Sequence, residues 1–110
     1  MPEMLDGLWT VEFGSSLGLF GAGVVVITGS RLLGGDPGYY YDGEFTLDNG
    51  NFTGILTVTQ YNENIVSVFG DIKKFSFDFS GKLVGDEFEI RAVFAGLDFI
   101  SRGKRRVALR

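Results

Sequence analysis

The sequence predicts an all-β protein folded as a single eight-stranded antiparallel up-and-down barrel that spans residues 1–110. Apolar residues recur with a period of two along most of the chain, and β-branched and aromatic residues dominate these stretches. The chain has 17 glycines but only 2 prolines, which is typical of turns and close packing rather than of a linker. Eight sequential strands with one apolar face each can close into a barrel, which removes exposed edges.

The first three strands are expected at 7–13, 20–28 and 31–35. The first alternates apolar with polar residues, which directs Trp9 and Val11 into the barrel. The next two are apolar on both faces, although a barrel wall in water needs only one apolar face. A second copy of the chain is the simplest cover, so we expect a homodimer built on the outer face of these two strands. The outward set is either Val24 with Val26 or Val25 with Ile27, and the residues expected at the dimer interface are Val25, Ile27 and Leu32.

Strands at 39–48 and 51–61 form a hairpin about Asn49-Gly50, the strongest two-residue hairpin signal, because both turn residues need positive φ. The turn fixes the register, which pairs Leu47 with Phe52, Phe45 with Gly54, Gly43 with Leu56 and Tyr41 with Val58. Each glycine then lies opposite a large inward residue and is expected to have room only for a hydrogen atom.

Strands at 71–84 and 87–95 form a second hairpin, and the last strand is expected at 99–109. A turn at Gly85-Asp86 pairs Leu83 with Phe88, Gly81 with Ile90, Phe79 with Ala92 and Phe77 with Phe94 on the buried side, and Lys82 with Glu89 on the other. A slip of one residue would destroy both the apolar face and the opposite-charge pair.

Two connections, at 14–19 and 62–70, are longer than a hairpin needs. Residues 65–69 are too apolar for a plain solvated loop, so we expect them to fold over a barrel end or to form a short extra element. Folded over the outer face of the second and third strands, they would cover it without a second copy. A two-sheet sandwich is the alternative architecture for the same strands.

The composition excludes several kinds of function. With no cysteine and no histidine, the chain has no disulfide, no thiolate or imidazole metal site and no Cys/His or Ser/His nucleophile, so we expect no metal and no cofactor. The net charge is −4 and the basic groups gather after residue 90, which argues against nucleic acid. No stretch has the roughly 18 apolar residues of a membrane span and residues 1–4 lack signal-peptide character. We therefore expect a cytoplasmic protein with no membrane partner.

Asp42 and Glu44, which lie near three tyrosines, are the only candidates for acid/base catalysis without histidine. The alternation places both acids on the face opposite Tyr41 and Phe45, which directs them to water. We therefore expect no enzymatic activity.

The barrel interior is the candidate site for a small apolar ligand, unless its aromatic side chains simply fill the core. Arg105 is in phase with Ser101 and Val107 on the inward side, where a charge must be paired or must bind an anion. A bulge at Gly103 that turns Arg105 outward is the alternative. The candidate ligand-binding residues are Trp9, Phe45, Phe77, Phe79, Phe94 and Arg105.

The first 60 or so residues carry several short motifs, which are Asp6-Gly7, Thr28-Gly29, Gly34-Gly35-Asp36, Tyr41-x-Gly43 and Gln60-Tyr61-Asn62. In these motifs the sequence resembles the GrlR-like family of small bacterial negative regulators linked to type III secretion. The resemblance implies a lipocalin-like barrel that dimerises and holds a transcription activator without catalysis. The family's acidic partner-binding run would fall near 47–51, where this chain keeps only Asp48. The partner-binding residues so implied are Asp48, Asn49 and Asn51.

The expected function is therefore a non-catalytic protein-binding module. The alternative is a carrier of a small apolar ligand inside the barrel.

Overall fold

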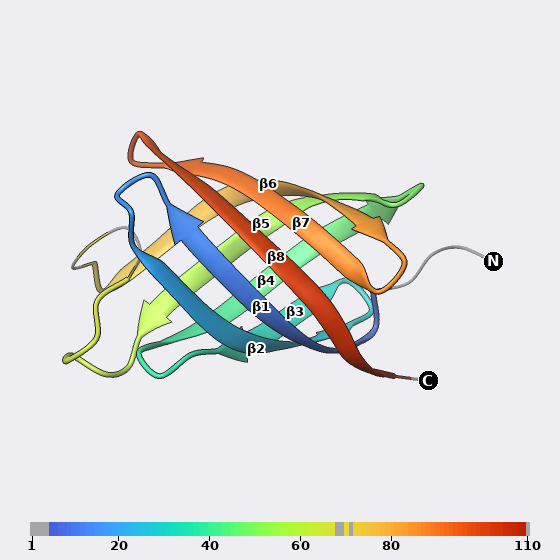
Figure 1. The fold of residues 1–110 in the computed structure, drawn as a ribbon, viewed down its shortest axis with the longest axis horizontal. Coiled ribbons are helices and arrows are strands. Elements are labelled where there is room, and N and C mark those ends of the chain that lie inside the picture. Colours follow the sequence, from blue (N-terminus) through green and yellow to red (C-terminus); the bar gives the residue numbers. More distant parts are fainter. Residues whose placement is uncertain (1–4, 68–69, 71, 110) are drawn as a thin grey trace.

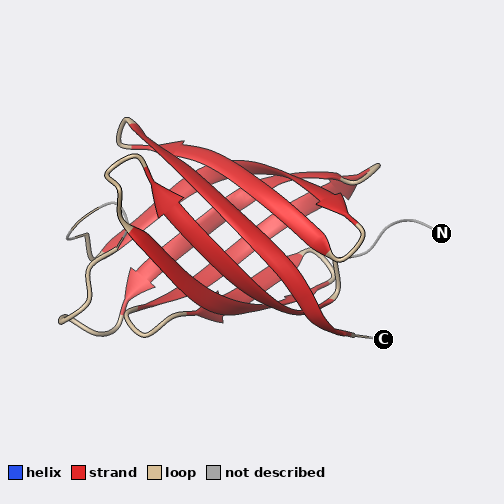
Figure 2. Cartoon of the chain, viewed as in Figure 1, coloured by secondary structure: helices blue, strands red, loops and turns tan. Residues whose placement is uncertain are grey.

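The structure is a computed structural model that describes residues 5–67, 70 and 72–109 of the 110-residue chain. The described residues form eight strands and no helix (Figures 1 and 2). The strands are β1 (Gly7–Ser15), β2 (Phe20–Thr28), β3 (Arg31–Gly35), β4 (Tyr39–Asp48), β5 (Asn51–Gln60), β6 (Lys74–Val84), β7 (Glu87–Phe94) and β8 (Leu97–Ala108). Each strand pairs antiparallel with the next, and β1 also pairs with β8.

The β1–β8 ladder closes the sheet into a barrel. This confirms the prediction of an all-β, eight-stranded, up-and-down barrel, and the architecture is consistent with a lipocalin-like fold. The sandwich alternative is wrong, because the two strands that would end separate sheets are hydrogen-bonded to each other along their whole length.

Both predicted hairpin registers are confirmed where the ladders extend. Phe45 pairs with Gly54 and Tyr41 with Val58 across β4 and β5, around a turn in which Asn49 and Gly50 have φ values of 52° and 79°. The β6–β7 ladder contains the four pairs Phe79 with Ala92, Gly81 with Ile90, Lys82 with Glu89 and Leu83 with Phe88. Alternation with one polar face therefore specified the pairing of these strands.

Several strand limits differ from prediction by one to three residues; the first strand, for example, ends at Ser15 rather than at residue 13. The last strand begins at Leu97 rather than at residue 99, because Ala95 and Gly96 both adopt positive φ and make a tighter turn than the sequence suggests. The sixth strand begins at Lys74 rather than at residue 71, which lies outside the described residues.

Two glycines of the β4–β5 hairpin have different amounts of space. A Cβ atom on Gly54 would overlap the carbonyl oxygen of Glu44 and lie 2.8 Å from the Cα of Phe45, so this position has room only for hydrogen. A Cβ on Gly43 would lie 3.0 Å from the Cδ1 of Leu56, the mobile end of a side chain. The expectation of equal crowding is therefore wrong for Gly43.

The two ends of the barrel carry different connections (Figure 1). Both chain termini lie at one end, with the turns β2–β3, β4–β5 and β6–β7. The other end carries the turns β1–β2, β3–β4 and β7–β8 together with the long connection from β5 to β6. The interior differs between these ends, and this difference positions the candidate site.

Candidate functional site

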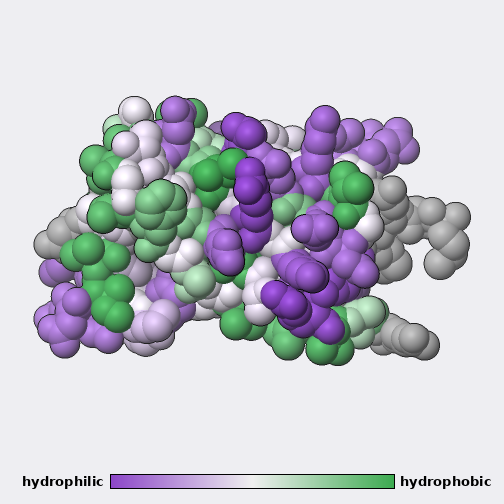
Figure 3. Space-filling view, viewed as in Figure 1, coloured by the Kyte–Doolittle hydropathy of each residue, from purple (hydrophilic) through white to green (hydrophobic). Residues whose placement is uncertain are grey.

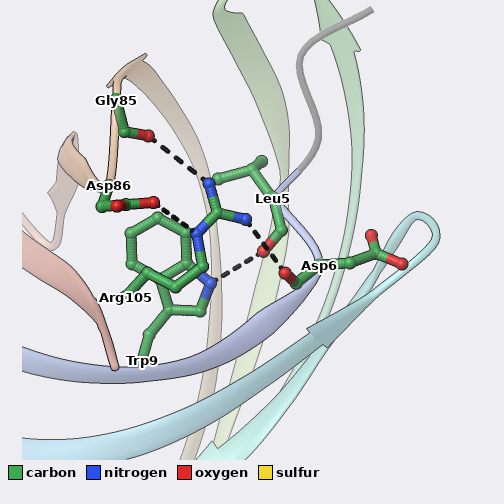
Figure 4. Close-up of polar contacts among 6 residues, drawn as sticks. All are labelled: Leu5, Asp6, Trp9, Gly85, Asp86 and Arg105. Carbon is green, nitrogen blue, oxygen red and sulfur yellow. Dashed lines mark hydrogen bonds and ion pairs between the residues drawn. The ribbon is translucent and has the colours of Figure 1, made fainter. Parts of the chain in front are cut away.

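Arg105 closes the end of the barrel that holds the termini (Figure 4). Its guanidinium lies 4.9 Å from the centroid of the Trp9 ring, and its Nε donates to the carboxylate of Asp86 at 2.8 Å. Its terminal nitrogens donate to the carbonyl oxygens of Asp6 at 3.0 Å and Gly85 at 3.4 Å. The inward charge is thus paired by groups of the protein itself, so Arg105 seals this end instead of serving as an anion site.

The bulge predicted at Gly103 lies elsewhere. Gly103 pairs regularly with Val11 and with Phe88, whereas the β1–β8 register shifts between Leu8 and Trp9. Leu8 pairs with Val107 and Trp9 with Arg105, so Arg106 is the extra residue. The bulge leaves Arg105 over the interior, as its phase predicted, but turns Val107 outward, although Val107 was expected on the same inward side.

Aromatic side chains fill the interior behind Arg105. The Trp9 ring is fully buried, packs 4.7 Å from the Phe88 ring and donates its indole N–H to the carbonyl oxygen of Leu5 at 2.7 Å. The Phe52 ring lies within 6.1 Å of the rings of Phe45, Phe79 and Phe88. These rings pack against one another across this level of the barrel.

The opposite half of the barrel contains a cavity of about 220 Å³. Smaller aliphatic residues such as Val11, Val25 and Val58 form part of its wall, so the side chains do not fill the barrel at this level. Aromatic and larger aliphatic residues complete the wall, namely Phe13, Leu32, Tyr39, Tyr41, Leu56, Phe75, Phe77, Phe79, Phe88, Ile90 and Phe99. The site is thus a mainly apolar chamber of the kind that holds small ligands in eight-stranded barrels.

The long connection after β5 covers this chamber. Ile65, Val66 and Ser67 belong to the cavity lining, which confirms for these residues that the segment folds over a barrel end; residues 68 and 69 lie outside the described residues. The segment is fastened to β5 by a bond of 2.8 Å from the Gln60 amide to the carbonyl oxygen of Ile65. Ile65 packs so closely on Gly38 that a Cβ there would lie 2.5 Å from its Cγ2.

The chamber reaches the surface beside this cover. Phe20, at the start of β2, belongs to the lining and is 82% exposed. Leu17 and Leu19 in the preceding turn and Val66 in the cover are also exposed. Figure 3 shows apolar surface at this end of the barrel, whereas polar surface dominates the middle of the same face. The mouth is therefore rimmed by apolar side chains.

Asp36 and Tyr41 form a polar pair at the mouth. The Asp36 carboxylate accepts bonds from the backbone N–H groups of Gly38 and Tyr39, each at 2.8 Å, and from the Tyr41 hydroxyl. Burial, reinforced by the bond to Asp36, raises the pKa of Tyr41 well above that of a free tyrosine, so its phenol stays protonated and donates. These bonds fix the β3–β4 turn, and the Tyr61 hydroxyl also donates to the carbonyl oxygen of Asp36.

Ser101 is a polar side chain deep in the chamber. It lies on β8 between Phe13 of β1 and Ile90 of β7, is 6% exposed and belongs to the lining. Within the part of the chain that the structure describes, its hydroxyl makes no hydrogen bond. The hydroxyl is accessible from the chamber, so a group of a bound ligand can form a hydrogen bond with it.

The chamber contains only part of the predicted ligand site. Phe77 and Phe79 line it, and their ligand-binding role stays a prediction. The other four predicted residues do not line the chamber. Trp9 and Phe45 belong to the aromatic half of the barrel, and Arg105 is bound at the sealed end. Phe94 packs against Phe75, with the two ring centroids 4.9 Å apart. Sequence reasoning missed Ser101, Tyr41 and Asp36, although a serine in the inward phase of the last strand was a usable signal.

The residues predicted for the dimer interface do not lie on the outer face. Val25, Ile27 and Leu32 are buried inside the barrel. Pairing with β1 places Val25 beside the inward Trp9, so the alternate residues Val24 and Val26, together with Leu33, face outward and are 46%, 38% and 43% exposed. The described part of the β5–β6 connection covers the barrel end rather than this face.

The remaining candidate groups lie on the outside. Asp48, Asn49 and Asn51 are exposed in the β4–β5 turn, at the end opposite the mouth of the chamber, and their partner-binding role stays a prediction. Asp42 is exposed and pairs with Arg31 at 2.8 Å, and Glu44 also points outward. Among the residues described, no three acidic side chains converge on a point where a metal ion could be held.

Comparison with protein-family models gives no match, and comparison with curated protein sequences gives none either. The resemblance to the GrlR-like family therefore stays a prediction. Within residues 5–67, 70 and 72–109 there is no helix with the length and apolar character needed to cross a membrane.

Proposed function

We propose that this protein binds a small, mainly apolar ligand in the chamber between the Phe52 layer and the 61–67 segment. The observation that carries the proposal is the cavity of about 220 Å³, walled mainly by apolar side chains. Packed protein interiors leave few voids larger than a water molecule, so a cavity of this size is a specific feature. The exposed ring of Phe20 and the neighbouring apolar rim support entry at this end.

Affinity in such a chamber comes from apolar area removed from water. Each buried methylene contributes about 0.8 kcal/mol, which corresponds to roughly a fourfold gain in affinity. A series of alcohols of increasing chain length should therefore gain affinity by about this factor per carbon until the chamber is full. Beyond that length the gain should stop.

The proposal is tested by fluorescence titration with N-phenyl-1-naphthylamine, a neutral apolar probe, and by native mass spectrometry for a ligand that purifies with the protein. Val58→Phe fills part of the chamber, whereas Val84→Phe adds the same volume on an exposed residue of β6. We expect the probe to bind the original protein and Val84→Phe, and to lose at least tenfold in affinity for Val58→Phe.

Circular dichroism must show that both variants are folded, because added volume in a packed core costs about 1–3 kcal/mol. Equal probe binding by folded Val58→Phe, or no binding by the original protein, would contradict the proposal.

We also propose that the outer face of β1 to β3 binds a second copy of the chain. Val107, Leu8, Val26 and Leu33 are direct neighbours across four adjacent strands and form an apolar row. On one side of this row β8 carries the exposed Arg106, and on the other β4 carries the exposed Glu44; within the described residues neither charge belongs to an ion pair. A two-fold axis through β2 would place the basic side of one copy over the acidic side of the other.

Sedimentation equilibrium at micromolar concentration tests this association. We expect a dimer mass for the original protein and for Val84→Lys, whose substitution lies on the opposite side of the barrel, and a monomer mass for Val26→Lys. High salt should weaken the dimer, because exposed charges contribute to it. A monomeric original protein would remove the second copy from the proposal and leave the chamber unaffected.

A further inference from the structure

The polar groups that line the chamber indicate which polar group a bound ligand carries. Ser101 belongs to the wall, and its hydroxyl makes no hydrogen bond to the described residues but is accessible from the chamber. A hydroxyl can both donate and accept, so it can satisfy either an alcohol or a carbonyl group of a ligand. The surrounding side chains of Phe13, Ile90 and Phe99 offer no other polar contact. The ligand is therefore expected to carry one polar group that reaches Ser101.

The charge of the chamber is set by Asp36. Of the described residues that line it, Asp36 is the only one with a formal charge, and that charge is negative. Its carboxylate oxygens already accept bonds from Gly38, Tyr39 and Tyr41. These bonds hold the carboxylate in place at the mouth.

No cation of the described lining offsets this charge. Arg105, which points into the barrel, is held at the sealed end by Asp86 and by backbone carbonyl groups, with the Trp9 ring against it. The layer of Trp9, Phe52 and Phe88 separates it from the chamber. An anionic ligand in the chamber would therefore lose its hydration without gaining a positive partner, and it would pass a fixed negative charge on entry.

Resting on the proposed function, we infer that the chamber selects a neutral lipophilic molecule with a single hydroxyl or carbonyl group, held at Ser101, and rejects the carboxylates of fatty acids. The serine supplies the polar contact, the aromatic and aliphatic wall supplies the affinity, and the absence of a cation from the described lining supplies the selectivity.

Displacement of N-phenyl-1-naphthylamine by three molecules of equal chain length tests the inference at pH 8. These are 1-octanol, methyl octanoate and octanoate, of which only the last is charged. We expect the alcohol and the ester to displace the probe at similar concentrations, and octanoate to need about a hundredfold more or not to displace it, because an unpaired buried charge costs several kcal/mol.

Matched serine variants test the polar contact. Ser101→Ala should weaken octanol binding about three- to tenfold, as expected for one hydrogen bond. Ser80→Ala, which removes a hydroxyl from the outer face of β6, should leave octanol binding unchanged. Circular dichroism must show that both variants are folded.

The outcomes separate this inference from the proposed function. Octanoate displacement equal to that of octanol would overturn the neutral-ligand inference and leave the chamber as an apolar binding site. Octanol binding that is the same in Ser101→Ala and Ser80→Ala would overturn the role of Ser101. Failure of the original protein to bind the probe or any of the three molecules would overturn the proposed function and the inference together.

Discussion

Replacing Gly54 by alanine should destabilise the barrel strongly, because the added methyl group meets backbone rather than mobile side chain. The new Cβ would overlap the carbonyl oxygen of Glu44 and lie 2.8 Å from both the Cα and the Cβ of Phe45. These atoms belong to the directly paired strand β4, so the strands must separate locally or bend. Overpacking a core by one methyl group costs about 1–3 kcal/mol, and contact with backbone places this variant near the upper end.

Gly43 provides the matched control on the same hairpin. Its added Cβ would meet the Cδ1 of Leu56 at 3.0 Å and the carbonyl oxygen of Ile55 at 3.4 Å, and a small rotation of the leucine relieves the first contact. Alanine also lowers the entropy of the unfolded chain, which stabilises either variant by about 0.4–1 kcal/mol. The cost of Gly43→Ala should therefore remain below about 1 kcal/mol, and the two variants should differ by about 2 kcal/mol.

Thermal unfolding followed by calorimetry measures this difference. An unfolding entropy of about 2.1 cal/mol/K per residue gives a chain of 110 residues about 0.23 kcal/mol/K, so 2 kcal/mol corresponds to about 9 °C in Tm. Urea titration with an unchanged m-value would show that only the native state is affected. Melting temperatures of the two variants that agree within about 2 °C would refute the close approach of β4 and β5 at Gly54.

Two further predictions concern the polar groups at the ends of the barrel. Arg105→Ala should lower the free energy of unfolding by about 1–3 kcal/mol. It should also shift the fluorescence emission of Trp9, the only tryptophan, to longer wavelength, because the guanidinium covers the Trp9 ring. Unchanged emission would contradict the role of Arg105 in closing this end. Tyr41 has its pKa raised in the folded state, so its contribution to stability is complete below about pH 10, the pKa of a free tyrosine, and is lost as pH rises through the folded value. Urea titrations should therefore show a steeper loss of stability above pH 10 for the original protein than for Tyr41→Phe, and parallel curves would refute the buried phenol.

The hairpins show what the sequence by itself determined. Asn49-Gly50 and Gly85-Asp86 are local turn signals, and the strands beside them alternate apolar with polar residues. A register error of one residue would expose every phenylalanine of β6, so the pairing is specified without knowledge of the rest of the chain. The same pattern was compatible with a closed barrel and with a two-sheet sandwich, and the ladder between β1 and β8 decided for the barrel.

The orientation of β2 was decided only by the tertiary structure. Val24 to Ile27 are apolar on both faces, so alternation gives no preference between the two sets. Pairing with β1, whose inward Trp9 lies beside Val25, made the choice. The bulge at Arg106 is of the same kind, since it depends on how β8 meets β1 when the barrel closes rather than on a glycine in the sequence.

The chamber also belongs to the tertiary structure. Whether a barrel is filled or hollow depends on the total volume of the inward side chains at each level. These side chains come from different strands, so their total volume cannot be read from neighbouring positions in the sequence. Trp9, Phe52 and Phe88 meet at one level and fill it, whereas valines from three strands meet at the other and leave space. Alternation in the sequence placed both Ser101 and Arg105 on the inner face. Only the tertiary structure decided that Ser101 faces the cavity and that Arg105 pairs with Asp86, because residues distant in the chain form both environments.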